Sequence, residues 1–436
     1  MSSPLSQWHV LPNEMKFAVI HQLDIQHVRA FATVSRDAYS LSIPTMWRHI
    51  HLKNCEALLS YVQNVPSTYH RFIRQLTICT KPASTLPDRA VISDALSALL
   101  AQCSQVECLN LSLESTLHES VVPSFGCLSS LKALSISHCG HEQNQPLSER
   151  LVVSMAATVP NLVELSLTCI ARSVIHAPEL VGAYPFVPVV VGDRNIPDHP
   201  LLGSELCLPS LLRLPSLKTL RVRDTHLGDH RWSTTPVCCS LQVLDLGSCY
   251  HESQDFNRIC TERIVGNVGH TVDEFSLATA ISAECLAPQA ELTPLKRLRK
   301  IHLTHLFPVE NVVDTLSALS DSPVEQLSVK CHEDDVVDMC SALVDFLNLR
   351  VERGQIALFK HLSEITVDTV ADIDEKVEVK PGMNISAVQA DAVKNLQAYC
   401  RDLHLASVGA TGPKCASDPS ATLDKSSFKS ATVLTH

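Results

Sequence analysis

The sequence predicts an α/β fold in which a small unit of three helices precedes a curved solenoid of short parallel strands and helices. Three observations support this prediction. The chain has 436 residues and is 45% hydrophobic, which is too long for one compact core of ordinary size. Only 5% of its residues are aromatic, and a leucine-based core suits stacked repeats better than a β-sandwich. A short leucine pattern also recurs from Leu76 onward.

The composition argues against several classes of partner. The formal net charge is −11, so there is no overall excess of Lys and Arg to neutralise nucleic-acid phosphates. An anionic membrane surface would repel the chain on average. No apolar stretch is long enough to span a bilayer, and the N-terminus lacks the pattern of a secretory signal. We therefore expect a cytoplasmic or nuclear protein without a nucleic-acid or membrane partner.

The 17 cysteines are scattered along the chain and include no Cys-x-x-Cys pair. This pattern favours a reduced protein that uses cysteine as a small buried hydrophobe. Cys139 and Cys249 each follow a predicted strand, where a small polar or thiol side chain can turn inward. Zinc is the alternative for Cys139, which His138 and His141 flank, but the spacing matches no standard zinc signature. We expect no metal and no other cofactor.

The first fifty residues carry a helical pattern. Pro12 suits the first turn of a helix, and an apolar stripe follows at helical spacing, made of Met15, Val19, Ile20 and Leu23. Asp24 can cap a second helix, and Ser35 can cap a third that we expect to stop at Pro44. Three helices of this length bury too little surface to stand alone, so the unit is expected to pack against something else.

An ordered set of residues runs through this unit between Trp8 and Leu52. It consists of Leu11-Pro12-Asn13-Glu14-Met15, Ile20, Leu23, Val28, Val34-Ser35-Arg36 and Trp47-Arg48-x-Ile50-x-Leu52. This set resembles the F-box motif, with Tyr39 near the place where that family often has tryptophan.

In the F-box family the helices bind a Skp adaptor, which links to a cullin. The resemblance implies an F-box over residues 5–52. It also implies the adaptor contacts Leu11, Pro12, Met15, Ile20, Leu23, Val28, Val34 and Trp47. The alternative is that these residues only pack against the rest of the chain. Exposed apolar stripes on a small helical unit usually mark an interface, which favours adaptor binding.

The recurring pattern behind this unit is Leu-x-x-Leu-x-Leu. Its central residues are Leu109, Leu134, Leu165, Leu220, Leu244, Phe275, Ile301, Leu327 and Ile365. Their spacing is irregular but close to the roughly 20–29 residues of leucine-rich repeats. We predict a leucine-rich-repeat solenoid over residues 53–405, with strands on the concave side and helices on the convex side. Residues 170–216 are predicted to be an irregular insertion, and residues 406–436 a disordered tail.

Strand alternation predicts which side chains face the concave surface, where a protein partner would bind. The candidates are Arg221, Arg223, Asp245, His302 and Lys330. The basic pair Arg221 and Arg223 could recognise an acidic or phosphorylated segment. An ordinary solvated strand face is the alternative.

The F-box resemblance implies a non-catalytic function: substrate recognition within a Skp–cullin–F-box ubiquitin ligase. One alternative is an F-box scaffold that acts outside degradation. Another is a repeat protein that inhibits its partner without any F-box adaptor. We found no sequence motif of a nucleotide-binding, hydrolase or metalloprotease enzyme. We therefore expect no enzymatic activity and a partner that is an unknown protein substrate.

Overall fold

The computed structural model describes Trp8 and residues 10–83, 88–284, 295–354, 358–370 and 387–408. Within these residues, no helix has both the length and the apolar character needed to cross a bilayer. The helices are α2 (Asn13–His21), α3 (Ile25–Ala32), α4 (Arg36–Met46), α5 (Cys55–Asn64), α6 (Arg89–Leu100), α7 (Val122–Phe125), α8 (Glu149–Thr158), α9 (Gln254–Val268), α10 (Val312–Ala318), α11 (Val336–Glu352) and α12 (Ala387–Asp402).

Short 3₁₀ helices occupy several of the connections on the helical side, including η1 (Ser67–Phe72), η5 (Leu208–Arg213) and η8 (Val309–Asn311). The strands are β1 (His49–Leu52), β2 (Gln75–Cys79), β3 (Cys108–Leu113), β4 (Ala133–His138), β5 (Glu164–Thr168), β6 (Arg172–Ser173), β7 (Val189–Val190), β8 (Thr219–Arg223), β9 (Val243–Leu246), β10 (Glu274–Leu277), β11 (Lys300–Leu303), β12 (Gln326–His332), β13 (Glu364–Val370) and β14 (Ala406–Val408).

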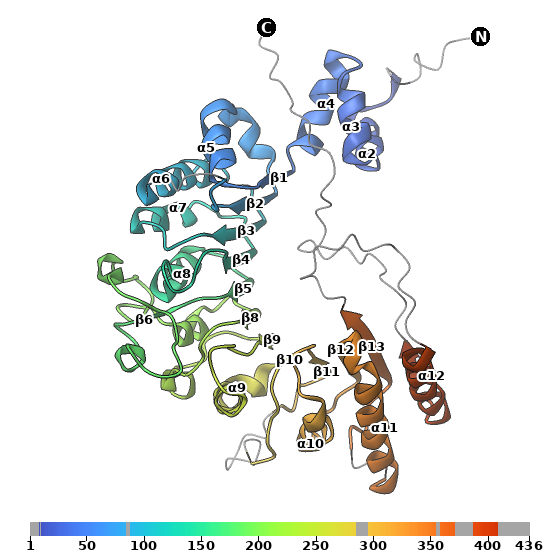
Figure 1. Ribbon diagram of the computed structural model, residues 1–436. Coiled ribbons are helices and arrows are strands. Elements are labelled where there is room, and N and C mark those ends of the chain that lie inside the picture. Colours follow the sequence, from blue (N-terminus) through green and yellow to red (C-terminus); the bar gives the residue numbers. More distant parts are fainter. Residues whose placement is uncertain are drawn as a thin grey trace, which may run out of the picture.

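One parallel sheet runs through the whole solenoid. Among the described residues it has 12 strands in the order β1-β2-β3-β4-β5-β8-β9-β10-β11-β12-β13-β14. The central residue of each predicted repeat pairs with the central residue of the next, for example Leu109 with Leu134 and Phe275 with Ile301. The strands line the inner side of an arc and the helices lie outside it (Figure 1). The predicted α/β solenoid, with concave strands and convex helices, is therefore present.

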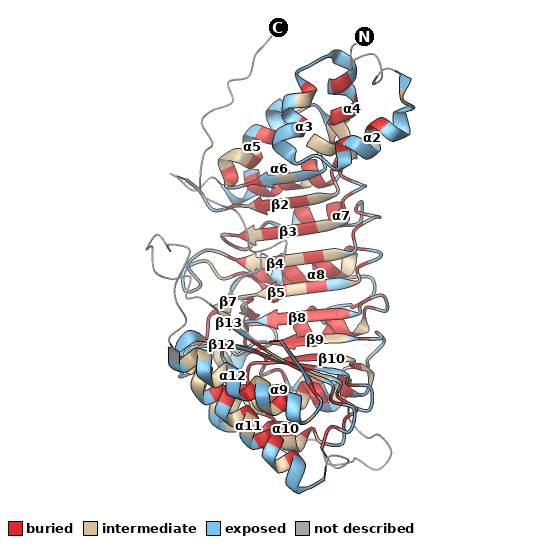
Figure 2. Ribbon diagram, turned by 90° about the vertical axis from the view of Figure 1, so that its right-hand side faces the viewer, coloured by how far each residue is buried: buried red, intermediate tan, exposed pale blue. Residues whose placement is uncertain are grey.

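Burial alternates along the strands as the leucine pattern requires. In β3 the leucines Leu109, Leu111 and Leu113 are buried, while the residues between them are partly exposed. Buried residues follow one another from strand to strand along the arc (Figure 2). One continuous apolar core runs from Leu52 to Leu405 because each repeat covers the apolar side of its neighbour.

The three N-terminal helices α2, α3 and α4, which we call the head, form a separate small core. Ile20, Val28 and Leu41 make its centre. The side chains of Asp24 and Ser35 accept hydrogen bonds from backbone amides at the starts of α3 and α4, as predicted. The expectation that Pro44 stops the third helix is wrong, because α4 continues through it to Met46.

The solenoid sheet extends beyond the range predicted for it at both ends. β1 lies within residues 5–52, yet it pairs with β2 and opens the large sheet. At the other end β14 pairs with β13, so residues 406–408 continue the sheet beyond the predicted boundary. The remainder of the predicted tail lies outside the described residues.

Residues 170–216 do not add a strand to the main sheet, because β5 pairs directly with β8. They form a two-stranded sheet of β6 and β7, which packs beside α8 around a buried ion cluster. Arg172 donates from Nε to Glu149 Oε1 (3.0 Å) and from Nη2 to Asp229 Oδ2 (2.8 Å). All three side chains are buried, so each charge is compensated within the protein.

Candidate partner-binding surfaces

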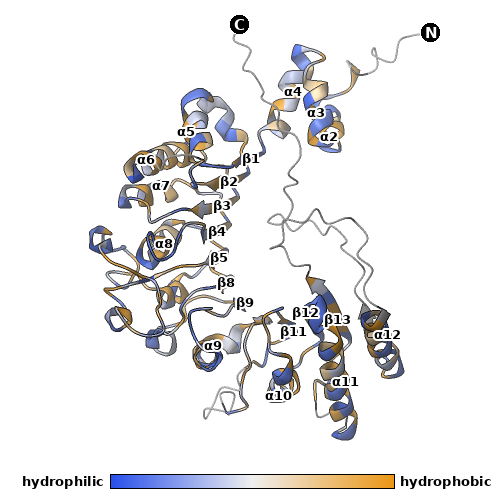
Figure 3. Ribbon diagram, in the orientation of Figure 1, coloured by the Kyte–Doolittle hydropathy of each residue, from blue (hydrophilic) through white to orange (hydrophobic). Residues whose placement is uncertain are grey.

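Four apolar side chains of the head are exposed, namely Met15, Val19, Leu23 and Val34, and we call them together the head surface. Met15 is 54% exposed and Val34 is 67% exposed. Hydrophilic and hydrophobic residues both occur along α2 (Figure 3), and in this helix Lys16 and Ile20 are buried while Met15 and Val19 are exposed. Pro12 is also exposed, and Leu11 is half-buried. Four of the predicted adaptor contacts, Pro12, Met15, Leu23 and Val34, are therefore open to a partner.

Two of the predicted adaptor contacts are buried inside the head. Ile20 and Val28 are fully buried in the head's own core. A partner cannot touch them without unfolding the head, so the prediction that they contact an adaptor is wrong. The reason is geometric. Where three short helices meet, the residues of one helical stripe do not all face the core, and some of them face solvent instead.

Trp47 lies at the junction between the head and the solenoid. Its ring stacks on Tyr69 of η1, with centroids 4.7 Å apart and planes 11° apart. The Tyr39 hydroxyl of α4 lies 3.4 Å from the Tyr69 hydroxyl. Trp47 thus joins the head to the solenoid, and in this structure it serves as an internal contact. The aromatic side chain at position 39 contributes to the same junction.

Both arginines of the predicted basic pair on the concave surface already form ion pairs with carboxylates of this chain. Arg223 donates to both oxygens of Asp245, at 3.3 and 2.5 Å. Arg221 lies 4.0 Å from Asp245 and 3.8 Å from Glu164. Asp245 itself is buried beneath the two arginines, although it was predicted to be an exposed partner contact. The prediction fails because the arginine side chains fold back over the neighbouring strand.

The other predicted concave residues also lie opposite acids. His302 Nε2 is 3.4 Å from Glu274 Oε1, and this contact lowers the pKa of Glu274. Lys330 is exposed and is paired in register with Asp368 on the next strand. The cationic groups therefore alternate with carboxylates, and the concave side of these strands is not a basic patch.

A second surface lies at the carboxyl ends of the strands, which we call the carboxyl edge. Glu142, in the loop after β4, crosses to the loop after β9. There its Oε2 accepts from the Tyr250 hydroxyl (2.5 Å) and from His251 Nε2 (3.0 Å). Burial acts to raise the pKa of Glu142, but the hydrogen bonds from His251 and Tyr250 hold it below its usual value. The sequence pattern carries no sign of this contact, because loops lack the leucine period.

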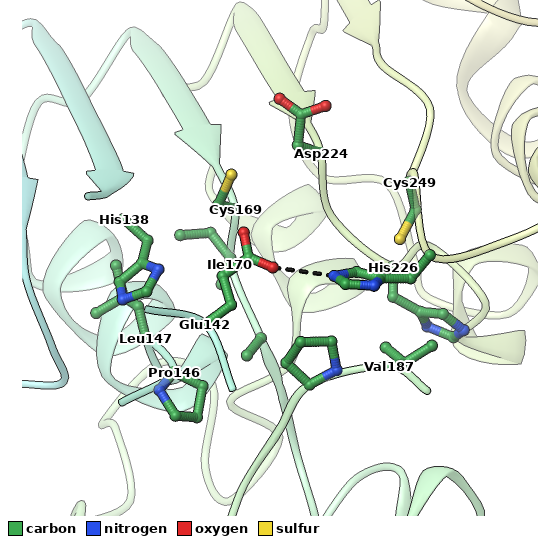
Figure 4. A pocket seen from close by; sticks show the side chains of 13 residues that line it. His138, Glu142, Pro146, Leu147, Cys169, Ile170, Val187, Asp224, His226 and Cys249 are labelled. Atoms are coloured by element: carbon green, nitrogen blue, oxygen red, sulfur yellow. Dashed lines mark hydrogen bonds and ion pairs between the residues drawn. The ribbon is translucent and has the colours of Figure 1, made fainter. Parts of the chain in front are cut away.

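Beneath this crossing lies a small cavity lined by Cys169, Asp224, His226 and Cys249 among others. Figure 4 shows Glu142, Cys169 and Cys249 gathered around it at the ends of the strands. Burial raises the pKa of the Cys169 thiol to about 12 and that of Cys249 to about 11, so both are protonated at neutral pH. These thiols are poor nucleophiles and poor metal ligands in that state.

The zinc alternative for Cys139 finds no support in the described part of the chain. No group of three or more His, Cys, Asp or Glu side chains there is arranged to hold a metal ion. His138 is instead within 3.0 Å of the backbone oxygens of Glu114 and Gln145. Cys139 lies 4.0 Å from the Glu114 carboxylate.

No family model matches the sequence, and no curated protein does. Among solved structures, the Rad7 and Elc1 complex of yeast is similar with 12% identity and a TM-score of 0.35, covering 89% of this chain and 96% of that chain. The complex of TLR13 with ssRNA13 is similar with 14% identity and a TM-score of 0.29, covering 71% of this chain and 40% of that chain. The solenoid architecture rests on the strand pairing and burial described above.

Proposed function

We propose that this chain is the substrate-recognition subunit of a Skp–cullin–F-box ubiquitin ligase. In this proposal the head binds a Skp-type adaptor, and through it a cullin, while the solenoid holds a protein substrate. The observation that supports it is the head surface. Met15, Leu23 and Val34 are exposed on a unit of three short helices, whereas the leucines of the solenoid strands are buried. Exposed apolar side chains on a small helical unit usually mark a protein interface.

The chain would act by proximity and contribute no catalytic residue. Holding a substrate and a ubiquitin-conjugating enzyme in one assembly raises the effective concentration of substrate lysines near the enzyme. This function requires two separate surfaces, one for the adaptor and one for the substrate. The head surface and the surfaces of the solenoid meet that requirement. Such a subunit is expected in the cytoplasm, the nucleus or both.

The test is affinity purification with a purified Skp-type adaptor and a cullin. Changing Met15 and Val34 together to Asp places two charges in the interface. Each buried apolar side chain contributes about 1.5–3 kcal/mol, so adaptor affinity is expected to fall at least about 100-fold. Both side chains are exposed in the free chain, and the double variant should fold normally.

Val91→Asp on α6 is the matched control, because Val91 is an exposed apolar residue of the solenoid. It should retain the adaptor. Failure of the wild-type chain to bind any Skp-type adaptor contradicts the proposal. Binding to the adaptor without recovery of the cullin would indicate an F-box scaffold that acts outside degradation.

A further inference from the structure

Two half-buried thiols meet at the carboxyl edge, near the N-terminal end of the solenoid. Cys79 is the last residue of β2, and Cys139 is the first residue after β4. β3 lies between these two strands (Figure 2). The side chains of Cys79 and Cys139 nevertheless share a hydrogen bond. Cysteines from two strands that are not neighbours are thus brought into direct contact.

The backbone holds both cysteines in place. Beside Cys79, the Thr80 hydroxyl accepts from the Glu114 amide (2.8 Å). The Cys139 amide donates to the Leu113 backbone oxygen (2.9 Å). At Gly140 a Cβ atom would overlap the Glu114 backbone oxygen, so only glycine lets the loop after β4 pass this close to β3. The contact between the two thiols is therefore built into the ends of the three strands.

The surroundings of the two sulfur atoms differ. Cys79 Sγ accepts hydrogen bonds from the Cys139 thiol and from the Lys81 backbone amide, and the Lys81 ammonium acts in the same direction. These contacts outweigh burial and the Glu114 carboxylate, and they lower the pKa of Cys79 to about 6. Cys139 lies 4.0 Å from Glu114 Oε2, and its hydrogen bond with Cys79 and its burial raise its pKa. At neutral pH the pair therefore holds one thiolate, at Cys79, and one thiol, at Cys139.

The thiolate sets Cys79 apart from the other cysteines of the described chain. Burial raises the pKa of the Cys103 thiol to about 12 and that of the Cys260 thiol to about 11. Among the described cysteines whose pKa is shifted, only that of Cys79 is lowered. Cys79 and Cys139 are half-buried, so a small oxidant can reach them. An accessible thiolate beside a second thiol is the arrangement typical of a peroxide-sensitive cysteine.

We propose that Cys79 is a site of reversible oxidation by hydrogen peroxide, and that Cys139 converts the oxidised product to a disulfide. In the first step the Cys79 thiolate attacks one peroxide oxygen. An S–O bond forms, the O–O bond breaks, and hydroxide leaves. In the second step the Cys139 sulfur attacks the sulfenic acid at Cys79. The S–S bond forms, the S–O bond breaks, and the oxygen leaves as water with the Cys139 proton.

The two sulfur atoms lose two electrons in total, and the peroxide is reduced to one water and one hydroxide. Hydrogen-bonded sulfur atoms are farther apart than bonded ones, so the two side chains move together as the disulfide forms. The new bond ties the end of β2 to the loop after β4 across β3. Neither step uses the head or a bound partner, so this inference stands apart from the proposed function.

Peptide mapping of the full chain reports on each cysteine separately. Trypsin releases residues 75–89 with Cys79 and residues 133–150 with Cys139, and neither peptide holds a second cysteine. After treatment with hydrogen peroxide at pH 7, mass spectrometry should find these two peptides joined by a disulfide that dithiothreitol reverses. Oxidation of Cys103 should be at least about 10-fold slower, because its thiol stays protonated.

The thiolate is tested without any oxidant. In the folded chain, the rate at which iodoacetamide alkylates Cys79 should reach half its plateau near about pH 6. In the chain unfolded by urea it should do so near about pH 8.5, the ordinary value for cysteine. Cys139→Ala removes the thiol donor and should raise the half-point of the folded chain by at least about one pH unit. Cys139→Ser keeps a hydroxyl donor and should stay closer to the wild type.

The same serine variant separates the two chemical steps. With peroxide, Cys139→Ser should stop at the sulfenic acid of Cys79, which dimedone traps, because no second thiol is present to displace the oxygen. Cys108→Ser is the matched control, since Cys108 is another half-buried cysteine and lies at the opposite end of β3. It should form the disulfide between Cys79 and Cys139 like the wild type. Circular dichroism checks that each variant is folded.

The inference is overturned if Cys79 in the folded chain is oxidised no faster than Cys103. It is also overturned if the alkylation of Cys79 has the same half-point in the folded and unfolded chains, or if Cys79 forms its disulfide with a cysteine other than Cys139. The adaptor pull-down is independent of these measurements. Failure to bind an adaptor contradicts the proposed function alone, whereas failure to form the disulfide contradicts this inference alone.

Discussion

The head and the solenoid cover their apolar residues to different extents. In the head, Ile20, Val28 and Leu41 form the core, while Met15 and Val34 remain outside it. In the solenoid, each repeat is covered by the next, and the core is continuous. Three short helices have too much surface for their volume, whereas a stacked array has neighbours on both sides. The comparison shows that stacking buries the strand leucines of the solenoid, while the short helices of the head leave several apolar side chains exposed.

The largest effect is expected where the solenoid buries charge. Arg172→Ala leaves Glu149 buried without its cation, whereas Asp229 keeps its ion pair with Arg231. The free energy of unfolding of the solenoid should fall by about 3–5 kcal/mol, because an uncompensated buried carboxylate is costly. Urea denaturation followed by far-UV circular dichroism measures this change.

Arg213→Ala serves as the control for that measurement, since Arg213 pairs with Glu205 at the surface. Its loss should cost no more than about 1 kcal/mol. Equal effects of the two substitutions would show that the buried cluster has no special role in stability.

A smaller and local effect is expected in the head. Ile20→Ala removes a fully buried side chain from a core of few residues. Such a change costs about 2–5 kcal/mol, and the head has little stability to lose. Amides of α2, α3 and α4 should exchange faster in hydrogen–deuterium exchange, while those of β3 to β5 stay protected. Faster exchange throughout the chain would mean that the head and solenoid unfold as one unit.

The smallest effect is expected at the junction between the two regions. Tyr69→Ala removes the ring that stacks on Trp47 and contacts Tyr39. Aromatic pairs of this kind contribute about 0.5–1.5 kcal/mol beyond their buried area. Exchange should accelerate at β1, which connects the head to the sheet, with little change elsewhere. Tyr184→Ala, at a fully exposed tyrosine, should leave the β1 amides unchanged.

The sequence predicted the solenoid well because its signal is periodic. Leu134 pairs with Leu165, and Leu165 pairs with Leu220 across the long insertion, as their shared place in the pattern requires. The helix caps at Asp24 and Ser35 were also predictable, because capping depends on residues within one turn. The path of the chain through α4 at Pro44 was not, since this proline lies in the last turn and α4 runs on to Met46.

The candidate surfaces were less predictable. The alternation of residues along the strands predicted which positions face the concave side. It did not predict that the Arg223 side chain would fold back onto Asp245. Helical spacing placed Ile20 and Met15 on one stripe without saying which of them faces the core. The contact between Glu142 and Tyr250 depends on loops that are distant in sequence and lack any period. Local patterns do not determine contacts of this kind.

The hydrogen bonds from Tyr250 and His251 to Glu142 have a mechanical consequence. In most of the arc each repeat touches only its neighbours, so small changes in angle between repeats could add up and open or close the curve. Glu142 ties the loop after β4 to the loop after β9 and spans the two strands between them. The middle of the arc should therefore hold a constant radius, while its two ends remain free to adjust to whatever they hold.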